Sequence, residues 1–122
     1  MSVLELRVTA SRIGTHAYVV AAAGEIDLYS AEQVQRTLAN VLEEGARAVV
    51  VDLMGVSFMD SAGLSVLISA AKAMRSRNGR LVVAADDRRI LRVLQITGLE
   101  RTLHVERSLV EAVERVVGDR HD

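Results

Sequence analysis

The chain has 122 residues, 50% of them hydrophobic, and a formal net charge of −1. A chain of this size and apolar fraction buries the core of one folded domain, and its near-zero charge gives no bulk attraction to nucleic acid or to an anionic membrane. Cysteine is absent, which excludes disulfides, thiolate metal sites and cysteine nucleophiles.

Two strands open the predicted domain. Alternating apolar and charged residues predict a half-exposed strand over residues 4–8. The apolar run at 17–23 predicts its hairpin partner, with a turn at 11–16 between them. The chain is then expected to leave the sheet at 24–27.

A helix and a central strand follow. The helix is predicted to start at Ser30, where Gln33 three residues later completes a capping-box pattern, and to end at Gly45. The continuous apolar run at 48–53 predicts a strand that is buried on both faces. Residues 54–59 are expected to form a loop.

Strands and helices alternate over the rest of the chain. The remaining predicted elements are a helix that follows residues 60–64 and stops at Gly79, a strand over 81–85, a helix opened by Asp86 and Asp87 and ended by Gly98, a strand over 103–105, and a helix capped by Ser108 and Glu111. This alternation after the first hairpin predicts an α/β layered fold with a mixed sheet.

The segment layout predicts one soluble domain over residues 1–117 and a short polar tail over 118–122. No apolar run approaches the ~18 residues of a membrane span, and the charged N-terminal stretch lacks the apolar segment of a signal peptide. We therefore expect a cytoplasmic protein without a membrane partner or direct contact with nucleic acid.

The stretch that could carry chemistry lies where the central strand leads into the next helix. An acid, a serine, a small residue and a glycine follow one another there as Asp60, Ser61, Ala62 and Gly63. In one interpretation Asp60 or Ser61 simply caps the helix by accepting hydrogen bonds from its first amides. No base, metal-ligand or cofactor pattern accompanies Ser61, so we expect no enzyme, no metal and no cofactor.

The sequence Phe-Met-Asp-Ser-Ala-Gly-Leu at 58–64 resembles the phosphorylation motif of the STAS-domain anti-sigma factor antagonists. Three further stretches resemble that family: Gly-Glu-Ile-Asp at 24–27, Val-Val-Val-Asp-Leu at 49–53 and Ile-Thr-Gly-Leu at 96–99. The likeness extends from about residue 4 to residue 117.

The resemblance implies a STAS-like fold, a mixed sheet of about five strands with helices packed mainly on one face. It implies a binding protein that is switched by phosphorylation of Ser61. Unphosphorylated, such a protein binds an anti-sigma factor, commonly a GHKL-type serine kinase, and so frees a sigma factor; phosphorylated, it lets go, and a PP2C-type phosphatase resets it. The expected partner-binding residues are Asp27, Asp60, Ser61, Gly63 and Ser65.

Simple electrostatics supports a switch at Ser61. A phosphate adds about −1.5 to −2 charges. At the start of a helix we expect it to meet backbone amides that have no other hydrogen-bond partner, so that the domain tolerates the charge. A partner docked beside Asp60 and Asp27 would meet new repulsion. Asp27 is expected near Ser61 because each follows an interior strand, and the family fold implies that those strands are parallel. Asp27 could instead cap the helix that begins at Ser30.

Two other kinds of protein share part of this pattern. Asp52 ends a buried strand as the phosphoacceptor of a response-regulator receiver does, but the turn at 9–16 lacks the acidic pair that holds Mg²⁺ in a receiver. The alternative that stays open is a STAS interaction module in another signalling or scaffold complex, a transporter tail or a small-ligand carrier.

Overall fold

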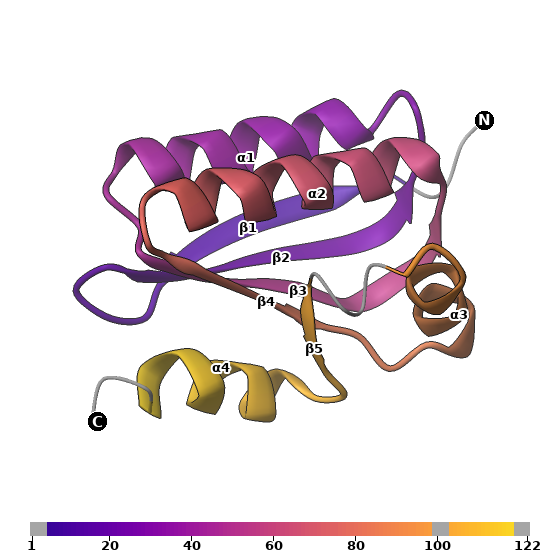
Figure 1. Ribbon diagram of the computed structural model, residues 1–122. Coiled ribbons are helices and arrows are strands. Elements are labelled where there is room, and N and C mark those ends of the chain that lie inside the picture. The colour runs from indigo at the N-terminus through magenta and orange to yellow at the C-terminus, as the bar shows by residue number, and fades with distance from the viewer. Residues whose placement is uncertain (1–4, 99–102, 119–122) are drawn as a thin grey trace.

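A single mixed sheet organises the computed structural model, which describes residues 5–98 and 103–118 (Figure 1). Within these residues the sheet has five strands in the order β1-β2-β3-β4-β5. The elements in chain order are β1 (Arg7–Arg12), β2 (Ala17–Ile26), α1 (Ala31–Glu43), β3 (Ala48–Met59), α2 (Ser61–Ser76), β4 (Arg80–Ala84), α3 (Arg88–Ile96), β5 (His104–Glu106) and α4 (Leu109–Gly118).

The strands pair as the hairpin and the later alternation predict. β1 and β2 are antiparallel, while β2, β3, β4 and β5 run parallel to one another. β3 lies at the centre, and its residues Val49, Val50 and Val51 are at most 1% exposed. Both faces of this strand are covered, which explains why its sequence is a continuous apolar run rather than an alternating one.

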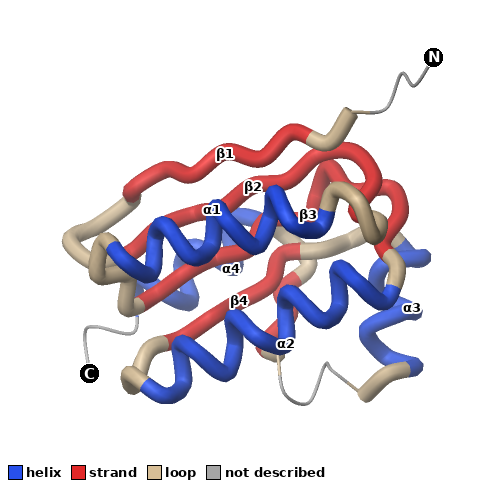
Figure 2. Tube along the Cα trace, turned by 90° about the horizontal axis from the view of Figure 1, so that it is seen from above, coloured by secondary structure: helices blue, strands red, loops and turns tan. Residues whose placement is uncertain are grey.

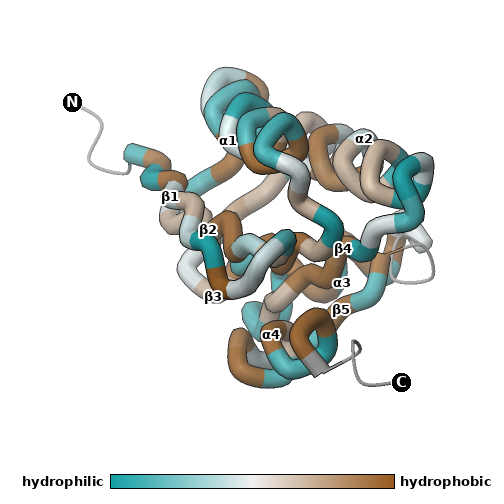
Figure 3. Tube along the Cα trace, turned by 90° about the vertical axis from the view of Figure 1, so that its left-hand side faces the viewer, coloured by the Kyte–Doolittle hydropathy of each residue, from teal (hydrophilic) through white to brown (hydrophobic). Residues whose placement is uncertain are grey.

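Helices cover both faces of the sheet, but unequally. α1 and α2 lie side by side over one face, and seen from above they begin at the same end of the molecule (Figure 2). Their buried side chains share one core with those of α3, whereas Ala112 and Val116 of α4 pack against Val50 and Val82 on the opposite face. In the side view the outward surface of α1 is largely hydrophilic (Figure 3). The predicted arrangement, a mixed sheet of about five strands with helices mainly on one face, is confirmed.

The largest differences between predicted and observed boundaries concern β1, β2 and β3, whereas β4 and β5 are shifted by one residue from the predicted 81–85 and 103–105. β1 occupies residues 7–12 rather than 4–8, because its register with β2 runs from Arg7↔Ala23 to Arg12↔Tyr18; residue 4 lies outside the described residues. β2 continues to Ile26 and β3 to Met59, so the loop expected at 54–59 is strand.

The extension of β2 and β3 has a physical cause. Two register shifts, between Ala21 and Ala23 and between Gly24 and Glu25, act as bulges that keep the strands paired although glycines interrupt the apolar pattern. In the second half of β3 only every third side chain is buried, at Leu53, Val56 and Met59, and Met54 and Phe58 remain exposed. This stretch therefore lacks the continuous hydrophobicity that marks the first half of the strand.

The last two helices follow their predicted caps. The Asp87 carboxylate accepts a hydrogen bond from the Arg89 amide at the start of α3, and the Arg89 guanidinium beside it lowers the pKa of Asp87 to about 2. Ser108 accepts one from the Glu111 amide at the start of α4. Gly118 is the last residue of α4; the rest of the predicted tail, 119–122, and Leu99 of the stretch 96–99 lie outside the described residues.

Candidate functional site

The carboxyl ends of β2 and β3 form the base of the candidate site. Ile26 pairs with Met59 in the parallel register, and the Asp60 amide donates a hydrogen bond to the Ile26 carbonyl at 3.1 Å. Asp27 and Asp60, each the first residue after its strand, therefore lie at the same edge of the sheet. This is the neighbourhood expected from two parallel interior strands.

Asp60 is the residue that caps α2. Its backbone is extended, and its carboxylate accepts hydrogen bonds from the amides of Ala62 at 2.9 Å and Gly63 at 3.4 Å. Ser61 is the first residue of the helix and is exposed. Its hydroxyl makes no hydrogen bond to any group in the described part of the chain. Of the two capping candidates, Asp60 performs the structural role and leaves the Ser61 hydroxyl uncommitted.

The cap changes what a phosphate on Ser61 would meet. The expectation of free amides at the start of α2 is wrong for Ala62 and Gly63, because the Asp60 carboxylate already accepts from both. A phosphate there would either compete with this carboxylate for the amides or stand beside it in solvent. In both cases two acidic groups share one helix end, and the added charge is not neutralised by the domain itself.

Asp27 fixes the start of α1. Its Oδ1 accepts hydrogen bonds from the amides of Tyr29 at 3.0 Å and Ser30 at 2.9 Å and from the Ser30 hydroxyl at 3.0 Å. The Ser30 amide, then its hydroxyl, holds the pKa of Asp27 below its ordinary value. This is an Asx-type turn, in which a short carboxylate binds the backbone two and three residues ahead. The interpretation of Asp27 as a cap thus describes its structural role.

The predicted capping box of Ser30 and Gln33 is wrong. Ser30 has helical backbone angles, φ −91° and ψ −15°, and its side chain does not cap α1. Its hydroxyl turns back toward β2, where it lies 3.0 Å from the Glu25 carbonyl and accepts a hydrogen bond from the Asp27 amide at 2.9 Å. An N-cap needs an extended backbone to point its oxygen at the following amides, and Ser30 does not have one.

Gly63 and Ser65 occupy opposite sides of α2. Gly63 is buried, and a Cβ on it would come within 2.5 Å of Met59 Cγ and 2.9 Å of Ile26 Cγ2. Glycine thus lets the first turn of α2 rest directly on the strand ends. Ser65 is exposed one turn after Ser61. Gly63 could affect the binding of a partner only by setting the position of α2, whereas Ser65 could contact the partner directly.

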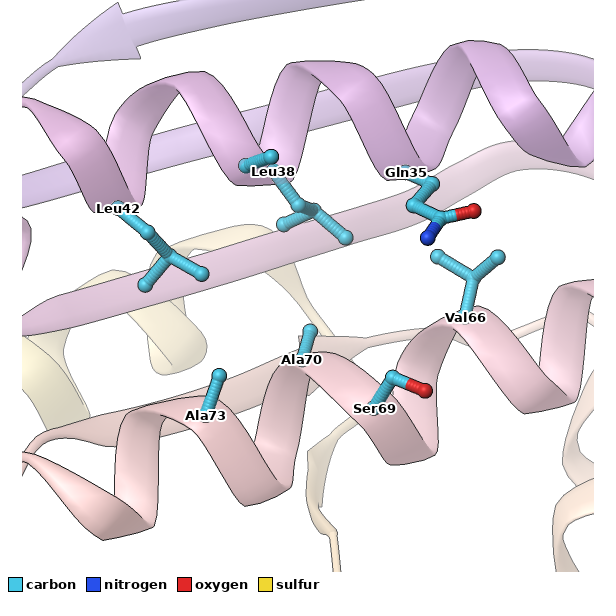
Figure 4. Close-up of a pocket in the computed structure, with 8 residues that line it drawn as sticks. Gln35, Leu38, Leu42, Val66, Ser69, Ala70 and Ala73 are labelled. Atoms are coloured by element: carbon cyan, nitrogen blue, oxygen red, sulfur yellow. The ribbon is translucent and has the colours of Figure 1, made fainter.

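A shallow groove runs between α1 and α2 from this site. Its middle part holds a cavity of about 170 Å³. There, leucines of α1 face alanines of α2 (Figure 4). At the end near Ser61 the groove is lined by Leu28, Ala31, Glu32, Gln35, Ala62, Ser65, Val66 and Ser69.

Sequence reasoning missed Leu28 and Tyr29, which stand between Asp27 and the first turn of α1. Both are exposed, by 69% and 88% respectively. The sequence does place two large apolar residues directly after a candidate site residue. A loop, however, has no periodic pattern from which their exposure could be predicted.

Two kinds of feature are absent from the described ranges, 5–98 and 103–118. No helix there is long and apolar enough to cross a membrane. No group of three or more His, Asp or Glu side chains there could hold a metal ion.

Comparison with known proteins identifies relatives over most of the chain. The STAS domain model matches residues 8–112. The anti-sigma-B factor antagonist of Staphylococcus aureus (strain NCTC 8325 / PS 47) is 34% identical over 88 residues, 72% of this chain and 82% of that protein. An anti-sigma factor antagonist from Mycobacterium paratuberculosis superposes with a TM-score of 0.85 at 26% identity, covering 93% of this chain and 95% of that one. The phosphorylated form of the Bacillus protein SpoIIAA shares the fold, with a TM-score of 0.72 at 20% identity over 90% of this chain and 99% of that one.

The assignment of the cap predicts different stabilities for neighbouring variants. Asp60→Ala should lower the free energy of unfolding by about 0.5–2 kcal/mol, because the first amides of α2 lose their acceptor. Asp60→Asn keeps an acceptor and should lose less, and Ser61→Ala should stay within about 0.5 kcal/mol of wild type. Urea denaturation of the purified variants measures all three. A larger loss for Ser61→Ala than for Asp60→Ala would reverse the assignment.

The turn at Asp27 predicts a pH-dependent contribution to stability. Because the folded state lowers the pKa of Asp27, its stabilisation is present above the unfolded value of about 4 and is lost as the pH falls below it. At pH 7 Asp27→Ala should melt earlier than wild type, and Asp27→Asn, which keeps an acceptor, should fall between them. The difference in melting temperature between wild type and Asp27→Asn should be smaller at pH 3 than at pH 7. Circular dichroism melts test this, and a constant difference would contradict it.

The close contact at Gly63 predicts that even one methyl group is harmful. Gly63→Ala improves helix propensity but forces Met59 and Ile26 apart, so we expect a net loss of about 1–3 kcal/mol in the free energy of unfolding. Gly14→Ala is the matched control, because its Cβ would meet only Ala17 Cβ at 3.4 Å. That control should remain within about 0.5 kcal/mol of wild type. Equal stability of both variants in urea would show that the close contact at Gly63 does not destabilise the alanine variant.

Proposed function

The chain belongs to the STAS domain family, among its anti-sigma factor antagonists, and we propose that phosphorylation of Ser61 switches its binding to an anti-sigma factor. Unphosphorylated, it binds an anti-sigma factor that is itself a GHKL-type serine kinase, and a sigma factor is released in the cytoplasm. Phosphorylated, it dissociates, and a PP2C-type phosphatase restores it. The observation that carries the proposal is the exposed hydroxyl of Ser61, left uncommitted because Asp60 caps α2.

The charge around Ser61 gives the switch its direction. A kinase that phosphorylates Ser61 has to bring the phosphates of its nucleotide to this hydroxyl. After transfer, the phosphate on Ser61 and the Asp60 carboxylate beside it face the negatively charged phosphates of the nucleotide across a desolvated contact. Weakening the complex tenfold requires about 1.4 kcal/mol, which one like-charge contact of this kind supplies.

The chain contributes to this cycle by binding and not by catalysis. The phosphoryl group, the nucleotide and the metal that carries it belong to the kinase, and the hydrolysing groups belong to the phosphatase. In this proposal Ser61 is the acceptor, Asp60 holds the first turn of α2 in place around it, and Asp27 holds the neighbouring loop. Ser65 is the next exposed residue along the same helix face.

The decisive experiment mixes the chain with each purified GHKL-type kinase of its source genome and ATP. One kinase should phosphorylate wild type and Ser76→Ala, the matched control at the far end of α2, and leave Ser61→Ala unmodified. Ser61→Ala should still bind that kinase, while the phosphorylated chain should bind at least about tenfold more weakly. Phosphopeptide mapping locates the phosphate, and biolayer interferometry gives the affinities.

Other outcomes would overturn this proposal. Phosphate on Ser57 or Ser65 with Ser61 unmodified would move the switch to another residue. Absence of binding to every kinase in the panel would favour a STAS interaction module in another signalling or scaffold complex.

A further inference from the structure

The loop between β2 and α1 exposes two large apolar side chains that no part of the described chain covers. Tyr29 is 88% exposed and Leu28 69% exposed. The chain has only three aromatic residues, and of the other two Tyr18 is buried in the core. An aromatic side chain that is left in water next to a candidate binding site is a typical anchor of a protein interface.

This loop is held in one conformation by its own hydrogen bonds. The Asp27 carboxylate binds the amides of Tyr29 and Ser30, and the Ser30 hydroxyl accepts from the Asp27 amide and lies against the Glu25 carbonyl. The backbone on both sides of Leu28 is thus tied to Asp27 and to the end of β2 by hydrogen bonds. A fixed loop loses little conformational entropy on binding, so more of the contact energy of the ring is retained as affinity.

The loop and Ser61 belong to one continuous surface. Leu28 lines the same hollow as Ala62 and Ser65 of α2, the residues next to and one turn beyond Ser61. α1 and α2 begin at the same end of the molecule (Figures 1 and 2), and the residues that line the hollow come from the N-terminal part of each helix and from Leu28. A partner that reaches Ser61 therefore also reaches the loop.

The charge of this surface indicates the chemistry of its partner. Residues 24–35 and 57–71 contain four acidic residues and no Lys or Arg. Asp27 and Glu32 lie on either side of Leu28 and Tyr29 along the chain, and Asp60 caps the adjacent helix. An apolar anchor within an acidic surface is complementary to an apolar pocket with a basic rim.

We propose that Tyr29, supported by Leu28, is the apolar anchor that enters a pocket with a basic rim on the anti-sigma factor. This rests on the proposed function, and it adds a second element to the same interface. Ser61 decides whether the complex persists, and Tyr29 supplies its affinity. The two are separable, because a change at Tyr29 leaves the phosphoacceptor hydroxyl and its cap unaltered.

The test measures affinities for the kinase that phosphorylates Ser61 in the panel above. Tyr29→Ala should weaken binding at least about tenfold and Leu28→Ala about fivefold, whereas Tyr29→Phe, which keeps the ring, should stay within about threefold. Val110→Ala is the matched control, because Val110 is 66% exposed on α4 at the opposite face of the sheet, and its affinity should not change. Glu32→Gln should slow association and reduce its salt dependence.

Stability measurements distinguish the loss of a contact from the loss of the fold. Because both side chains are exposed, the melting temperatures of the Tyr29 and Leu28 variants should stay within about 2 °C of wild type. If Tyr29→Ala melts early, Tyr29→Gln replaces it, since glutamine keeps much of the length and removes the ring. This variant should also weaken binding at least about tenfold.

Three results would overturn the anchor, and they can be told apart. If the kinase binds wild type and Tyr29→Ala equally, the anchor fails while the proposed function stands. If no kinase binds wild type, the proposed function and the anchor fail together. If wild type sediments as a dimer that Tyr29→Ala dissociates, the occupant of this surface is a second copy of the chain.

Discussion

The pairing of β2 with β3 up to their last residues is the constraint on which the site depends. It ends with the hydrogen bond from the Asp60 amide to the Ile26 carbonyl, after which both chains leave the sheet at one edge. Each then enters a helix on the same face of the sheet, so the starts of α1 and α2 lie together. The site is thus built from two short connections that the sheet holds in register, a common position for functional loops in α/β folds.

Much of this arrangement could be predicted, because burial leaves a clear pattern in the central strand and along the helices. Residues 49–51 form a continuous apolar run since both of their faces are covered. The second half of β3 could not be predicted in the same way. Gly55 and Ser57 interrupt its pattern, and the bulges in its pairing with β2 depend on the partner strand, which local sequence does not record.

The two helix starts show how far local chemistry can be read from residue types. Ser30 and Gln33 have the spacing of a capping box, yet the side chain of Asp27 governs the turn, and the backbone angles of Ser30 decide between these possibilities. At α2 the candidates were Asp60 and Ser61, and only the extended backbone of Asp60 lets its carboxylate reach the amides. In both cases the sequence leaves two candidate capping side chains, and the tertiary structure decides which of them accepts the hydrogen bonds.

The edges of the sheet have a consequence for how the protein behaves in a crowded solution. β5 has three residues, and β1 at the other edge begins and ends with arginine and is largely exposed. Short or charged edge strands resist pairing with the strands of another molecule, which is how soluble sheets avoid growing into aggregates. In the described part of the chain, strand addition is thus disfavoured at both edges, and attachment is left to side chains at the end of the molecule where α1 and α2 begin.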